Sequence, residues 1–224
     1  MPRTGLASRG FSPSVTRSKS AEPPAVIVAI DEPSLAALGR WPWDRDVHGR
    51  LLDRLGEAGA AAVGVSILFA EPGAGDSQLA AALARSGRVS LPVAPAEAPV
   101  GRGVQALLPL PALAAGAAAL GHVDVELDAD ALVRRTFRHA GLGSAHWPAL
   151  SVAVAEATRP ASASPPPTPQ AVGLITASPT QWVRDGEMLL PYPQQRDAPP
   201  VYSYIDVLRA PSLAGALAGK AVFV

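Results

Sequence analysis

The residues best suited to binding chemistry gather where aspartates, arginines and two tryptophans follow apolar runs. The segment 26–45 reads V-I-V-A-I-D-E-P-S-L-A-A-L-G-R-W-P-W-D-R, and a second run, V-G-V-S-I-L-F-A-E, ends at residue 71. Open α/β sheets bind ligands outside the carboxyl ends of their strands, so residues that follow these runs are expected to share one rim of the sheet. The candidate ligand-binding residues are Asp31, Arg40, Trp41, Trp43, Arg45 and Glu71.

This rim has two interpretations. Carboxylates and guanidinium groups there would hold a small polar ligand by ion pairs, while the indole rings stack on it. Alternatively, Asp31 or Asp44 pairs with Arg45 and caps a helix, and Trp41 and Trp43 fix the loop to the sheet. The residue types and their spacing leave both interpretations open for the rim as a whole.

An enzymatic alternative rests on Asp31, because phosphoryl-transfer enzymes also place a nucleophilic aspartate after the first strand. Pro33 occupies the place of the second acid in a D-x-D motif, and no lysine lies between Lys19 and Lys220 to balance a phosphoryl group. Phosphoryl transfer by Asp31 is therefore the remotest hypothesis, and we expect the chain not to be an enzyme.

Metal and cofactor chemistry is not indicated. Four acids alternate along residues 124–130 and would share one face of a strand, but the pattern crosses a predicted turn and lacks the glycine and terminal glutamate of a calcium loop. The four histidines show no ligand spacing and are expected at the surface or at helix ends. With no cysteine in the chain, we expect neither a metal nor a cofactor.

Composition limits the partners. Lysine plus arginine and aspartate plus glutamate both number 19, so no net field attracts nucleic acid. Hydrophobic residues make up 48% of the chain, enough for a packed core. The longest apolar stretches are either shorter than the ~20 residues of a membrane-spanning helix or interrupted by proline.

The elements that position the rim alternate between strand and helix. Apolar runs predict strands over 26–30, 61–69 and 89–93, and apolar spacings of three and four predict helices over 46–58 and 77–86. Strand, helix and strand in succession form βαβ units with parallel crossovers. The segments 122–127 and 132–139 predict a hairpin, so the expected fold class is α/β, with a mixed, largely parallel doubly wound sheet and an inserted antiparallel hairpin.

The remaining predicted elements, a tail and a surface loop complete the domain organisation. A short helix is expected around 113–120, a helix over 148–157, another from 202 to 208, and a final strand over 221–224 that the chain end cuts off. Residues 1–24 are expected to be a disordered basic tail, and residues 25–224 a single domain. The segment 160–170 is rich in proline and is expected to be a surface loop.

Six pieces of this sequence, in this order and spacing, resemble the CHASE type 2 family of sensory domains. They are V-I-V-A-I-D-E-P-S-L-A-A-L-G-R-W-P-W-D-R at 26–45, R-L-L-D-R-L at 50–55, V-G-V-S-I-L-F-A-E-P at 63–72, G-H-V-D-V-E-L-D-A-D at 121–130, Y-S-Y-I-D-V-L at 202–208 and G-K-A-V-F-V at 219–224. The chain departs from the family pattern at Ser66, where relatives have aspartate, and at Ala131, where they have glycine.

The resemblance implies an extracytoplasmic sensor domain, on the periplasmic or cell-surface side of the membrane. It also implies a membrane-anchored receptor whose cytoplasmic kinase or nucleotide cyclase responds to a small-molecule or ionic signal. A homodimer is possible, and the alternative role is a structural or dimerisation module that binds no ligand. If a ligand binds at the rim, we expect the segment 40–55 to move, because it joins the rim to the rest of the sheet.

Overall fold

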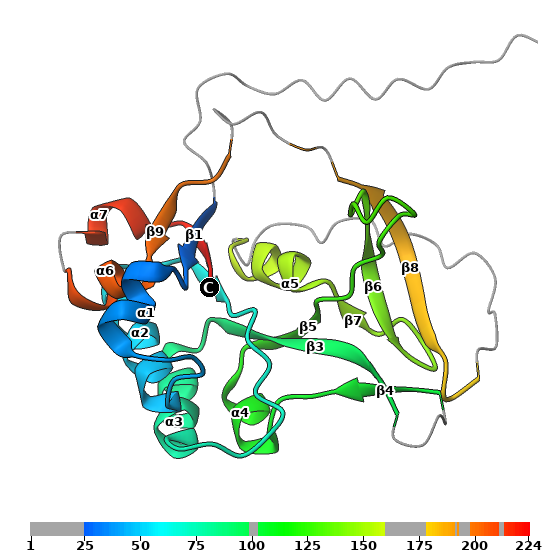
Figure 1. Ribbon diagram of the computed structural model, residues 1–224, viewed down its shortest axis with the longest axis horizontal. Helices are drawn as coiled ribbons and strands as arrows, with labels where there is room; N and C mark the ends of the chain where they lie inside the picture. The colour runs from blue at the N-terminus through cyan, green and yellow to red at the C-terminus, as the bar shows by residue number, and fades with distance from the viewer. Residues whose placement is uncertain (1–24, 99–102, 160–177, 191, 193–197, 211–212) are drawn as a thin grey trace, which may run out of the picture.

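The structure is a computed structural model that describes residues 25–98, 103–159, 178–190, 192, 198–210 and 213–224. The predicted tail at 1–24 and the predicted surface loop at 160–170 lie outside the described residues. The domain contains one large sheet with helices around it and one small sheet at its far end (Figure 1).

The large sheet has seven strands in the order β4-β3-β2-β10-β1-β9, with β5 paired to β3. These strands are β1 (Ala25–Ala29), β2 (Ala62–Gly64), β3 (Val89–Glu97), β4 (Val104–Leu107), β5 (Ala119–His122), β9 (Val201–Ser203) and β10 (Ala221–Phe223). All pairs are parallel except β3 with β4. The prediction of a largely parallel α/β sheet is confirmed.

Helices cover both faces of this sheet, as a buried parallel sheet requires. They are α1 (Glu32–Leu38), α2 (Arg45–Glu57), α3 (Asp76–Ser86), α4 (Pro111–Gly116), α5 (Leu150–Ala157), α6 (Tyr204–Arg209) and α7 (Ala214–Leu217). Leucines of α2 and α3 pack with Val63 in the main core. The next residue, Gly64, points to the opposite face, where an added Cβ would lie 2.8 Å from Val154 of α5. Glycine at position 64 therefore lets α5 lie directly on the sheet.

The small sheet contains β7 (Trp147–Pro148), β6 (Arg135–Leu142) and β8 (Trp182–Leu189), all antiparallel. The inserted antiparallel part is confirmed, but the predicted pairing of 122–127 with 132–139 is wrong. Strand β6 pairs along its length with β8, and only an isolated bridge joins Glu126 to Arg135. The segment 122–127 does not form the predicted strand of the hairpin, because its first residue, His122, ends β5, which pairs with β3 in the large sheet.

The strand order and several predicted boundaries also differ. Strand β10 lies between β1 and β2, so the two strands of the first predicted βαβ unit are not neighbours in the sheet. The predicted strand 61–69 is regular only over β2, and the helix expected around 113–120 is α4 followed by β5. Pro148 belongs to β7, and the expected helix at 202–208 is preceded by β9. None of the described helices has the length and apolar character that a membrane crossing requires.

Candidate functional site

Asp31 lies just beyond β1 and caps helix α1. Its carboxylate accepts hydrogen bonds from the Ser34 backbone N–H (3.1 Å), the Ser34 hydroxyl and the Ser203 hydroxyl (2.9 Å). The Ser34 hydroxyl also accepts from the backbone N–H of Ile205 at 3.1 Å. Hydrogen bonding, led by the Ser34 hydroxyl, holds the pKa of Asp31 below its usual value. This cluster therefore joins the starts of α1 and α6 at the carboxyl ends of β1 and β9.

The two rim tryptophans pack in the loop between α1 and α2. Trp43 is only 5% exposed, and its indole N–H donates to the Gly39 carbonyl at 2.9 Å. The Trp41 ring meets Trp43 edge-on with 5.2 Å between centroids, and Trp43 lies 4.9 Å from the ring of Tyr204. These are the contacts expected if the tryptophans fix the loop to the rest of the fold.

Arg45 holds the segment that follows β2 against the start of α2. Its Nε lies 3.4 Å from the Asp76 carboxylate, and its Nη2 donates to the Glu71 carbonyl at 3.4 Å. Its guanidinium also stacks over the Phe69 ring, 4.6 Å from the centroid. The side chain is 14% exposed, so most of its charged group already has protein partners.

The six predicted rim residues are thus divided among separate local contacts. Trp41 touches Trp43, Arg45 reaches the backbone of Glu71, and Asp31 binds serines. Arg40 and the carboxylate of Glu71 are exposed. Within the described residues, neither of these two side chains forms a hydrogen bond or ion pair with another rim residue. A ligand-binding role for the rim stays a prediction.

Beneath the rim lies a buried polar pair that the sequence did not reveal. His48 of α2 is 3% exposed, Tyr204 of α6 is fully buried, and the tyrosine hydroxyl lies 2.9 Å from His48 Nδ1. Burial, with the nearby charge of Arg45, lowers the pKa of His48 to about 4, and burial raises the pKa of Tyr204. The expectation of histidines at the surface or helix ends is wrong for His48, because its imidazole fills an aromatic cluster, and for His122, which is 2% exposed at the end of β5.

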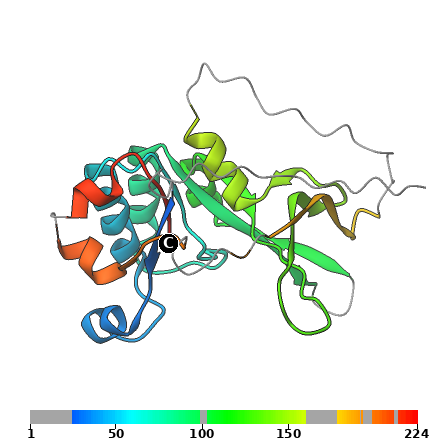
Figure 2. The ribbon, with the colours of Figure 1, turned by 90° about the horizontal axis from the view of Figure 1, so that it is seen from above.

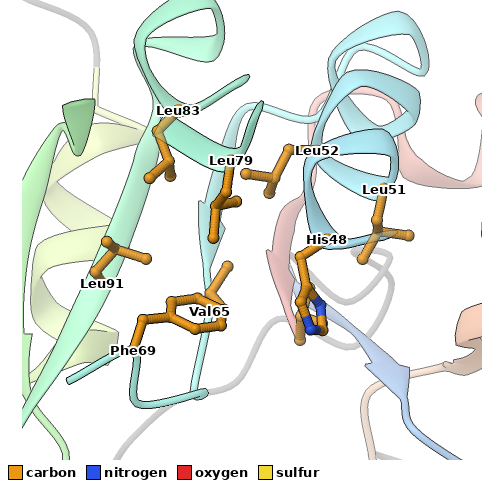
Figure 3. Close-up of a pocket in the computed structure, with 9 residues that line it drawn as sticks. His48, Leu51, Leu52, Val65, Phe69, Leu79, Leu83 and Leu91 are labelled. Carbon is orange, nitrogen blue, oxygen red and sulfur yellow. The ribbon is translucent and has the colours of Figure 1, made fainter. Parts of the chain in front are cut away.

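His48 borders a small internal cavity between α2, α3 and the sheet (Figure 3). The cavity measures about 10 Å³, close to the smallest space that holds one water molecule. Besides His48, its lining is apolar: Leu51, Leu52, Val65, Phe69, Leu79, Leu83, Leu91 and Val224. His48 Nε2 has no hydrogen-bond partner among the described residues. The cavity is too small for a metabolite, so this part of the core is close-packed and holds α2 against the sheet.

A larger opening lies elsewhere, between the large sheet and the small one. This inter-sheet hollow has a volume of about 480 Å³. It is lined by Pro95 of β3, Val104 of β4, and Thr180, Gln181, Trp182 and Arg184 in or beside β8. Its size falls within the usual range for small-molecule sites. The hollow therefore places an indole ring and a guanidinium group beside open space.

A buried carboxylate fixes those two side chains. Asp124, which follows β5, is 5% exposed and accepts from Trp182 Nε1 at 2.9 Å and from Arg184 Nε and Nη2 at 2.6 and 3.0 Å. Burial raises the pKa of Asp124, but the hydrogen bonds from Arg184 and Trp182 outweigh it and leave the pKa below its usual value. Nearby, buried His122 lies 3.1 Å from the Phe137 carbonyl of β6 through Nε2. Polar contacts thus connect β5 of the large sheet to β6 and β8 of the small one.

The alternating acids do not share one exposed face. Asp124 points inward to Arg184, whereas Asp128 and Asp130 pair with Arg134, and Asp128 also pairs with Arg135, all at 2.7–2.9 Å. Arginines therefore occupy the positions that a cation would take. Within the part of the chain that the structure describes, no three His, Asp or Glu side chains are grouped to hold a metal ion.

The family model for the CHASE2 domain matches residues 8–224, nearly the whole chain. The chain belongs to the CHASE2 domain family. CHASE2 domains are sensory, non-catalytic domains that lie outside the cytoplasmic membrane. No curated protein and no solved structure matches the chain.

The two positions where the sequence departs from the expected family pattern, Ser66 and Ala131, lie just after β2 and in a turn. Ser66 follows β2 with an exposed side chain, and its backbone N–H donates to the Val224 carbonyl at 2.7 Å. Ala131 has a φ of 61° in the turn between Asp128 and Leu132, a conformation that favours glycine. Ala131 therefore holds this turn of the domain at some cost in backbone strain.

Proposed function

We propose that this chain is the sensory domain of a transmembrane receptor and binds a small-molecule signal in the inter-sheet hollow. The receptor passes the bound state to a cytoplasmic kinase or nucleotide cyclase, from a periplasmic or cell-surface position. The observation that supports the ligand site is the pairing of an open volume of about 480 Å³ with Trp182 and Arg184 beside it. CHASE2 membership supports the sensory role.

The lining indicates a ligand with a planar face and hydrogen-bonding groups. Trp182 offers an indole surface for stacking, and the neighbouring Thr180 and Gln181 are exposed polar residues. Arg184 already shares its charge with Asp124 and lies 3.9 Å from Glu126 through Nη1. A strongly anionic ligand is therefore less suited to the hollow than a neutral or weakly charged polar ring.

The position of the hollow also supplies a way to transmit binding. Its lining comes from both sheets, and polar contacts of Asp124 and His122 join those sheets nearby. A ligand that contacts both walls favours one relative placement of the sheets over another. A sensor requires this differential affinity for two conformations.

The test is a thermal-shift screen of the chain against small polar metabolites and ions. We expect hits that lose their effect in Trp182→Ala and Thr180→Ala but keep it in Asp31→Ala and Trp43→Ala. Trp182→Phe serves as the matched control, because it retains an aromatic face in the hollow while removing the indole N–H. Hits abolished only by the rim variants would place the ligand at the rim and contradict the hollow.

A structural module without a ligand is the second candidate, and the occupied rim favours it. Trp43 is buried and Arg45 is engaged by Asp76 and Phe69, so these two rim residues serve packing here. This candidate predicts that no compound shifts the melting temperature. It also predicts that the receptor's output responds to changes in association alone.

A further inference from the structure

The outward face of α2 carries a short stripe of four charged residues. In chain order they are Arg50, Asp53, Arg54 and Glu57, with signs plus, minus, plus and minus. Their spacing of three or four residues places them along one side of the helix. Their side chains are 59%, 43%, 47% and 65% exposed, respectively. The stripe therefore faces away from the core and is available to a partner.

The order of these charges is complementary to itself when reversed. Two antiparallel α2 helices, related by a two-fold axis between positions 53 and 54, bring Arg50 opposite the partner's Glu57. The same arrangement brings Asp53 opposite the partner's Arg54. All four contacts across the axis then join opposite charges, and an isologous two-fold interface requires such self-complementarity. We propose that this stripe is a homodimer interface with a second copy of the chain.

Contacts within one chain leave room for these pairs. Arg54 pairs with Glu57 at 2.8 Å, Asp53 with Arg85 at 2.9 Å, and Arg50 with Asp46 at 3.5 Å. An ionised carboxylate has about four acceptor sites, and a guanidinium group has five donors, so each side chain can bind a second partner. Two copies would thus extend existing ion pairs into one network across the axis.

Two surface hollows lie beside the stripe, so the proposed interface is not flat. One, of about 140 Å³, is mainly apolar, and the other, of about 380 Å³, is lined by Leu38, Leu208, Arg209 and stripe residues. Arg54 and Glu57 border both hollows, so the long side chains of a partner's stripe can enter on either side. Helices α2, α6 and α7 lie at the opposite end of the molecule from the small sheet (Figures 1 and 2). The interface therefore leaves the inter-sheet hollow free and does not depend on the proposed ligand site.

An interface built on exposed charges is weak and sensitive to salt. Raising sodium chloride from about 50 mM to about 500 mM shortens the screening length to a few ångströms, and we expect self-association to weaken at least about tenfold. Attachment to one membrane raises the effective concentration of two copies, so weak affinity suffices there.

Sedimentation equilibrium of charge-reversal variants tests the proposal. Arg50→Glu places an acid opposite the partner's Glu57, and Glu57→Arg places a base opposite the partner's Arg50. Each single variant is expected to self-associate at least about tenfold more weakly than the parent at low salt. Glu156→Arg is the matched control, because Glu156 is also an exposed helical glutamate, on α5. It is expected to associate as the parent does.

Mixing the two single variants gives the sharpest result. One chain then presents two acids where the other presents two bases, so the mixture is expected to form a heterodimer more readily than either variant forms a homodimer. The double variant Arg50→Glu/Glu57→Arg is expected to self-associate like the parent. The proposal is overturned if the parent is monomeric at low salt and millimolar concentration, or if folded single variants associate like the parent. It is also overturned if mixing restores nothing.

Discussion

The rim and the inter-sheet hollow are built from the same residue types and differ in how completely the fold covers them. At the rim, Trp43 and Arg45 lie under α1, α6 and the segment after β2, and their polar groups have protein partners. At the hollow, Trp182 and Arg184 are held by Asp124 but border about 480 Å³ of open space. Tryptophan, arginine and aspartate therefore belong to a close-packed core in one place and lie beside an open hollow in the other, depending on which elements lie above them.

The largest expected effect tests whether packing of the rim tryptophans stabilises the fold. Trp43→Ala removes a buried indole that contacts Tyr204 and Trp41, and it should lower the free energy of unfolding by about 4 kcal/mol. Urea unfolding followed by circular dichroism measures the change. Trp41→Ala is the control and should cost less, because Trp41 is only half-buried. A loss below about 1 kcal/mol for Trp43→Ala would mean that the rim is not held by packing.

The next effect concerns buried His48 below the rim and the dependence of stability on pH. Burial lowers the pKa of His48 from 6.5 to about 4, so between these values the unfolded chain binds a proton that the folded chain does not. Stability therefore falls as the pH drops through this window, by about 3 kcal/mol at full titration. His48→Gln should flatten most of this slope in unfolding measured from pH 7 to 4. His122, whose pKa is also lowered by burial, should supply the slope that persists.

A smaller effect distinguishes the buried contact at the hollow from its exposed neighbours. Asp124→Asn removes the charge that binds Arg184, and it should lower the free energy of unfolding by about 2 kcal/mol. The loss is moderate for a buried pair because Arg184 is 36% exposed and can be hydrated. Asp128→Asn is the control, and it should lower the free energy of unfolding less, because Asp128 belongs to a more exposed network of ion pairs. Equal losses would show that Asp124 does not join the two sheets.

The smallest effect separates capping from ligand binding at Asp31. Asp31→Ala should lower the free energy of unfolding slightly, because α1 loses its N-cap, whereas Asp31→Asn should change it little because asparagine caps helices equally well. Chemical unfolding of both variants measures this difference. A ligand that needs the carboxylate would instead lose binding in both variants, which would reassign the signal to the rim.

Local patterns predicted the elements but not their neighbours. The apolar run at 26–30 identifies β1 and the periodic leucines of α2 identify that helix, because burial imposes those patterns. The end of β3 was missed because its alanines and prolines are typical of loops, and β4, only four residues long, was missed because it lies in a segment rich in alanine, proline and glycine. The place of β10 between β1 and β2 could not be predicted, because an apolar run does not specify which strands flank it.

The same limit applies to the sites. Asp31 was predicted at the carboxyl end of β1 because strand ends are visible in sequence, and it lies there. Asp124 and Arg184 are 60 residues apart, and neither carries a local signal of the contact between them. The alternating acids at 124–130 indicated a charged segment, but the alternation alone could not show that Asp124 is the acid that points inward.

The central position of β10 has a consequence for biosynthesis. Its residues 221–223 leave the ribosome after every other described strand, yet they fill the gap between β1 and β2. Until then, both neighbours present unpaired backbone groups along an apolar surface, which is a template for mispairing. We therefore expect that the sheet cannot close before β10 emerges, and that truncation before residue 221 leaves a split sheet prone to aggregation.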